Sequence, residues 1–147
     1  MHKSRLHYLL LSIVILLTAS ACGPSLVLQD VDYSQPLESV LVPDTEQNIH
    51  DQRYAVKFSI SSLLMEEGVT EIDEIHMIRN RAGFYFITAS GFNNVYIFTP
   101  GASTLELVEK ILVAENGISE PAFNQRDTYI ELIDRNNGET YNLNYSK

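Results

Sequence analysis

The chain has 147 residues, with 19 acidic side chains, 10 Lys and Arg side chains and a formal net charge of −9 at pH 7. A chain this acidic has no basic surplus to neutralise phosphates, so its composition argues against nucleic-acid binding. It contains a single cysteine, which excludes an intramolecular disulfide and a cysteine-rich zinc site.

The first 21 residues have the pattern of a secretory signal peptide. "MHKSRLHY" carries Lys3 and Arg5 and no acid, and the apolar run "LLLSIVILLT" follows over residues 9–18. Such a run falls within the roughly 7 to 15 residues of a signal peptide and short of the about 20 that span a bilayer. Residues 19–21 extend the run to a marginal span, so an uncleaved anchor is the alternative.

The end of this segment, "ASAC" at residues 19–22, resembles the lipobox of bacterial lipoprotein precursors. It departs from the family pattern at Ala19, where Leu is usual, and it covers the signal region only. The resemblance implies that Cys22 becomes the first mature residue and carries lipid, which holds the protein at a membrane. Gly23, in place of Asp, implies the outer membrane, facing the periplasm. Ordinary cleavage after "ASA", giving a secreted protein, is the competing interpretation.

Residues 22–52 are predicted to be the lipidated cysteine and a tether, because Pro24, Pro36 and Pro43 interrupt a stretch without a sustained period. "SLVLQDV" and "ESVLV" are nevertheless apolar enough to dock on the domain as an edge strand. Residues 53–147 are predicted to form a single β-rich domain, since about 95 residues supply one modest core.

Within this domain we expect strands and one short helix. "RYAVKFSI", residues 53–60, alternates Tyr54, Val56, Phe58 and Ile60 on one face. "SSLLMEEG" predicts a helical turn ending at Gly68. Three aromatic or β-branched runs predict an antiparallel meander over residues 74–99. For residues 103–115 a capping box favours a helix and β-branched residues favour a strand.

The last hairpin is predicted to close at Asn137-Gly138, the preferred pair for a two-residue type I′ turn. This closure places Ile130 opposite Tyr145, Leu132 opposite Leu143 and Asp134 opposite Tyr141.

An offset of 44 residues superposes Tyr85 on Tyr129 and Asn93 on Asn137. This pattern resembles β-propeller blades, but the chain is too short for the four blades that close a propeller. The expected fold is therefore mainly β: a small antiparallel sheet or meander with blade-like hairpins.

No catalytic, cofactor or metal site is predicted. The glycines form neither "GxGxxG" nor "GxxxxGK". His50 and His76 lack the spacing of zinc ligands, and His76 is expected on a half-solvated strand surface. Ser90 in "ASGFN" is not a nucleophile elbow.

The acidic run over residues 66–74 is expected to be a solvated loop, with a calcium site as the alternative because hard oxygen ligands are plentiful. Its carboxylates belong to Glu66, Glu67, Glu71, Asp73 and Glu74.

The sequence thus predicts a lipid-anchored bacterial envelope protein that is not an enzyme and acts as an interaction or structural module, with an envelope protein as a possible partner. The alternative is a small-ligand or glycan-binding envelope protein that uses exposed aromatic side chains.

Overall fold

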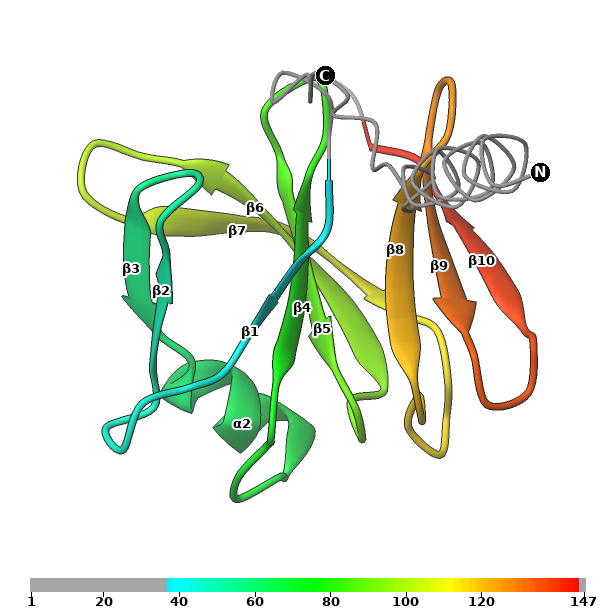
Figure 1. The fold of residues 1–147 in the computed structure, drawn as a ribbon, viewed down its shortest axis with the longest axis horizontal. Helices are drawn as coiled ribbons and strands as arrows, with labels where there is room; N and C mark the ends of the chain where they lie inside the picture. Colours follow the sequence, from blue (N-terminus) through cyan, green and yellow to red (C-terminus); the bar gives the residue numbers. More distant parts are fainter. Residues whose placement is uncertain (1–36, 146–147) are drawn as a thin grey trace, which may run out of the picture. The chain divides into compact units, whose positions relative to one another are not determined.

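The computed structural model describes residues 37–145, and it confirms a mainly β fold with one short helix (Figure 1). The elements are β1 (Ser39–Leu41), β2 (Asn48–Asp51), β3 (Val56–Ser59), α2 (Ser61–Glu67), β4 (Ile75–Arg79), β5 (Tyr85–Ala89), β6 (Asn94–Pro100), β7 (Leu105–Leu112), β8 (Pro121–Gln125), β9 (Ile130–Asp134) and β10 (Thr140–Leu143). All strand pairs are antiparallel.

A five-stranded sheet with the order β1-β4-β5-β6-β7 is the centre of the fold. The predicted meander over residues 74–99 is confirmed as β4, β5 and β6, which pair consecutively. A second sheet has the order β10-β9-β8, and β2 and β3 form a separate hairpin.

Both faces of the central sheet are covered. One face packs against the β2–β3 hairpin and α2, in a core that includes Ile49, Leu64, Met77 and Ile87. The opposite face packs against the β8–β10 sheet, in a core that includes Phe86, Ile97 and Leu132. Because β4, β5 and β6 are buried on both faces, their sequences are nearly continuous apolar runs.

The predicted helical turn is confirmed as α2. It ends at Gly68, which adopts φ 68° and whose following residue, Val69, donates its N–H to the Leu64 carbonyl. This left-handed conformation costs glycine nothing because it has no Cβ.

Within residues 103–115 the chain forms a strand, β7, and not a helix. The eight residues of β7 pair with β6 along their length, with a bulge opposite Ile97 and Phe98. The bulge adds one residue, so Val108 and Ile111, three positions apart, both face the second core. The β-branched residues thus indicated the observed strand, whereas the capping box pattern indicated a helix that does not form.

The strand predicted over residues 53–60 is shorter, because β3 begins at Val56. Asp51 accepts the N–H of Arg53, and Ala55 adopts φ 53°, so the chain turns here. Val56 and Phe58 pack on the first core, as the alternation indicates.

The folded part extends N-terminally of residue 53. β1 and β2 lie within the range predicted as a tether, and "ESVLV" does form an edge strand, since β1 is the terminal strand of the central sheet in the described region. Cys22, the signal segment and "SLVLQDV" lie outside the described residues.

The predicted register of the last hairpin is wrong by two residues. Tyr141 lies opposite Leu132 and Leu143 opposite Ile130, and only Gly138 of the turn pair has a positive φ, of 76°. The turn is therefore not type I′. A slip of two keeps the same side chains on the buried face, so the alternating pattern cannot detect it.

The offset of 44 residues does relate two hairpins, β5–β6 and β9–β10. They belong to different sheets, and the sheets of the described region have five, three and two strands. A four-stranded blade is therefore not formed by residues 37–145.

Candidate functional site

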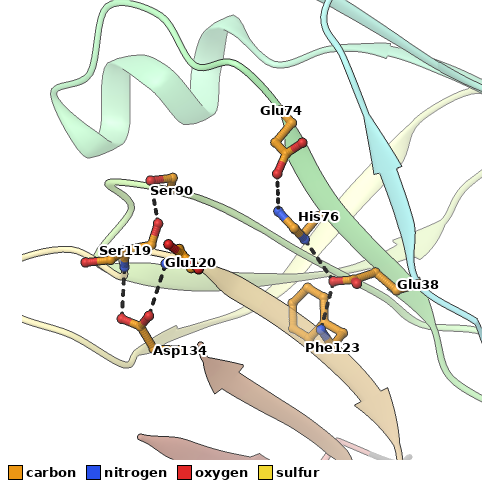
Figure 2. Close-up of polar contacts among 8 residues, drawn as sticks. All are labelled: Glu38, Glu74, His76, Ser90, Ser119, Glu120, Phe123 and Asp134. Atoms are coloured by element: carbon orange, nitrogen blue, oxygen red, sulfur yellow. Dashed lines mark hydrogen bonds and ion pairs between the residues drawn. The ribbon is translucent and has the colours of Figure 1, made fainter. Parts of the chain in front are cut away.

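His76, on β4, lies between two carboxylates at the junction of the two larger sheets (Figure 2). Its Nδ1 is 2.9 Å from Oε1 of Glu38, and its Nε2 is 3.1 Å from Oε1 of Glu74. Only 2% of His76 is exposed. The expectation of a half-solvated surface for this histidine is therefore wrong, because neighbouring elements cover the face of β4 on which it lies.

The strand register brings these groups together. Val40 of β1 lies opposite His76, which places Glu38 beside the ring, and Glu74 precedes β4 by one residue. An ionised carboxylate only accepts hydrogen bonds, so both contacts are satisfied together when both ring nitrogens carry hydrogen.

Glu38 also connects the central sheet to the second sheet. Its Oε1 accepts the backbone N–H of Phe123, at 2.8 Å, from β8. One carboxylate oxygen thus receives donors from β4 and from β8, which lie on different sheets.

A second buried carboxylate, Asp134, organises the adjacent loops. It accepts the backbone N–H groups of Ser119 at 2.9 Å, Glu120 at 3.0 Å and Asn136 at 3.0 Å. Burial alone would raise the pKa of Asp134, but the three N–H donors overcome this effect and hold the pKa below its ordinary value.

His76 borders a cleft of about 610 Å³, the acidic cleft, whose lining includes four acidic side chains. The lining includes Glu71, Asp73, Glu74, His76, Ser90, Ser119, Glu120 and Arg135.

The cleft contains the residue types of a serine hydrolase without their pairing. The hydroxyl of Ser90 donates to the Ser119 carbonyl at 2.8 Å, as Figure 2 shows, while both nitrogens of His76 face carboxylates. These hydrogen bonds connect loops and strands of the two larger sheets to one another.

The acidic run over residues 66–74 is partly structural. Glu67 accepts the Asn93 N–H at 2.7 Å, the Asn94 amide at 2.8 Å and the Tyr96 hydroxyl at 2.6 Å. Burial, and then the bond to Glu67, raises the pKa of Tyr96. The interpretation of this run as a solvated loop is therefore wrong at Glu67.

The other acids of the run do not converge on a cation position. Glu66 pairs with Lys110 at 2.6 Å, and Glu74 contacts His76. Within residues 37–145, no group of three or more His, Cys, Asp or Glu side chains is arranged so that it could hold a metal ion.

A second cavity, the apolar groove, has a volume of about 600 Å³ and lies between β3 and the β6–β7 connection. Its larger apolar lining residues are Val56, Phe58, Leu63, Ile87, Phe98 and Leu105, and hydroxyl side chains from Ser59, Ser62, Ser103 and Thr104 line it as well.

The other histidine considered in the sequence, His50, is exposed on β2 and lies opposite Lys57 of β3. His76 belongs to a different sheet. Glu38, Glu74 and Asp134 were not singled out as partners of buried donors. Asp134, at a strand end before "NN", had a local turn signal, whereas nothing near Glu38 in the sequence indicated its contacts.

No protein-family model, no curated protein and no solved structure matches the chain. In the described part of the chain, no helix combines the length and apolar character needed to cross a membrane.

Proposed function

We propose that the chain is a lipid-anchored protein of the bacterial cell envelope and that its β domain is a non-catalytic interaction or structural module. The observation that carries this proposal is Cys22, the one cysteine of the chain, placed directly after a signal-like apolar run. Attachment of lipid through the sulfur requires a cysteine at this position, whereas ordinary secretion does not.

The polar groups of the domain support a binding or structural role. Neighbouring protein groups form hydrogen bonds with the side chains of His76, Ser90 and Asp134. Such groups stabilise loops and sheets, and a nucleophile paired with a base is not among the contacts of the cleft.

Gly23 supports placement in the outer membrane, with the domain facing the periplasm. Removal of Lys3 and Arg5 with the signal peptide would change the formal charge from −9 to −11. A domain of this charge is repelled by anionic lipid, so retention at the membrane would depend on the acyl chains.

Metabolic labelling tests the anchor. Cells that produce the wild-type chain should incorporate labelled palmitate into it, and Cys22→Ser should abolish the incorporation. Ser25→Ala, three residues away, is the matched control and should label normally. Labelling of the Cys22→Ser chain equal to that of the wild type would refute attachment at this residue.

Small-ligand binding is the second candidate, and the apolar groove is the observation that favours it. Its aromatic lining consists of Phe58 and Phe98.

A further inference from the structure

We propose that the apolar groove binds the acyl chain of a long-chain fatty acid, with the carboxylate next to Lys57. This inference rests on the proposed function, because a lipid tether would hold the groove at a membrane, where acyl chains are abundant.

The apolar part of the groove suits a hydrocarbon chain. Val56 and Phe58 from β3 and Phe98 and Leu105 from the β6–β7 hairpin are only partly buried, although all four pack against the first core. A ligand chain in the groove would cover apolar surface that the fold leaves partly in water. The volume, about 600 Å³, lies within the range of about 300 to 1,000 Å³ typical of small-ligand sites.

The floor of the groove is rigid. Leu63 belongs to α2 and Ile87 to the central strand β5, and both are buried members of the first core. The groove is thus formed in advance between secondary-structure elements, so binding costs little ordering of the protein.

Charge selects the head group. Among residues 37–145, Lys57 is the one charged residue in the lining of the groove and no carboxylate lines it, although acids outnumber bases in the chain by 19 to 10. Lys57 forms no ion pair within 4 Å among residues 37–145, whereas Lys110 is paired with Glu66. A negatively charged head group would therefore meet an ammonium that is not held in an ion pair within 4 Å.

The acidic cleft makes the opposite selection. Four acids, Glu71, Asp73, Glu74 and Glu120, line it beside one arginine, Arg135, so the excess of negative charge disfavours a carboxylate there. The two cavities have similar volumes but differ in the charge of their linings. Because of this difference in charge, we place the fatty acid in the groove.

Photocrosslinking of the full chain, reconstituted in phosphatidylcholine liposomes, tests the assignment. The probe is palmitate that carries a diazirine. After irradiation we expect crosslinks within residues 55–63 and 98–105. Unlabelled palmitate should displace the probe, and hexadecylamine, with the same chain and a cationic head, should displace it at least tenfold less effectively.

Two matched pairs of variants locate the site. Leu105→Asp should reduce crosslinking about tenfold, and Leu112→Asp, at an exposed position of the same strand, should not. Lys57→Gln should weaken displacement by palmitate about tenfold, and Lys110→Gln should not. If Leu105→Asp fails to fold, the displacement measured on Lys57→Gln tests the proposal, because Lys57 is exposed and its substitution leaves the core intact.

Equal crosslinking of the Leu105→Asp and Leu112→Asp chains, or equal displacement by the amine and the acid, would overturn the proposal. The same measurement on the Cys22→Ser chain separates it from the anchor, because the groove crosslink requires light and does not require Cys22. Loss of palmitate labelling in cells would leave the groove result unaffected.

Discussion

The imidazole Nδ1 of His76 lies 2.9 Å from Oε1 of Glu38, and that same oxygen lies 2.8 Å from the backbone nitrogen of Phe123. A carboxylate before the first described strand thereby connects the central sheet to the second sheet, beside the apolar core that lies between them.

Truncation at this point should weaken the domain. Glu38→Ala leaves the Phe123 N–H and the His76 ring without their acceptor, and unpaired buried donors cost about 1 to 3 kcal/mol. We expect a loss of about 2 kcal/mol in the free energy of unfolding, measured by urea denaturation. Glu109→Ala, at an exposed position of β7, is the control. Equal midpoints for the two variants would contradict the linking role of Glu38.

Asp134→Asn should destabilise the domain at neutral pH, by about 2 kcal/mol, because the amide nitrogen cannot accept the N–H groups that the carboxylate holds. The exposed Asp127→Asn is the control.

The effect of Asp134 should depend on pH. Its pKa is lowered in the folded state, so its contribution is fully present above the unfolded-state pKa of about 3.9 and is lost as the pH falls through the folded value. The difference between wild type and Asp134→Asn should therefore shrink below about pH 4. A difference that stays constant down to pH 2 would contradict the hydrogen-bonding account.

The pKa of Tyr96 should respond to Glu67. Burial raises this pKa, and the negative charge of Glu67 raises it further. In Glu67→Gln the pKa should fall and still exceed the ordinary value of about 10, because burial remains. Titration of ring-labelled tyrosine by NMR measures the change, and Glu115→Gln, on an exposed loop, is the control. An unchanged Tyr96 titration would mean that the 2.6 Å contact has no electrostatic effect.

Substitution of Gly138 should destabilise the domain because of the backbone conformation at this position. It has φ 76°, and a Cβ there would meet nothing within 4 Å, so steric contact adds no cost. Gly138→Val should lower stability by about 1 kcal/mol or more. Gly138→Asn should be milder, since Asn tolerates the left-handed region. Equal thermal melts for wild type and the Val variant would show that the turn readily adopts another conformation.

Local patterns in the sequence predicted several of the elements but not how the elements pack against one another. The runs around Ile75, Phe86 and Val95 predicted three strands, because apolar content and turn residues are local signals. They did not reveal that β8 covers the face of β4 that contains His76. The partners of that histidine come from the segment before β1 and from the loop before β4, and local spacing does not predict such contacts.

The last hairpin illustrates the same limit. Asn137-Gly138 correctly marked a turn, and Gly138 does need a positive φ. The register instead accompanies a longer loop around Asp134, whose carboxylate binds Ser119 and Glu120 from another segment. Only nonlocal contacts distinguish the observed register from the predicted one, since both keep Leu132 and Leu143 buried.

Mass spectrometry of the N-terminus of the mature wild-type protein, purified from bacterial membranes, tests the proposed anchor most directly. We predict that the chain begins at Cys22, with a diacylglyceryl group on its sulfur. A mature chain with an unmodified Cys22, or one that retains residues 1–21, would contradict the proposal that this protein is anchored by lipid.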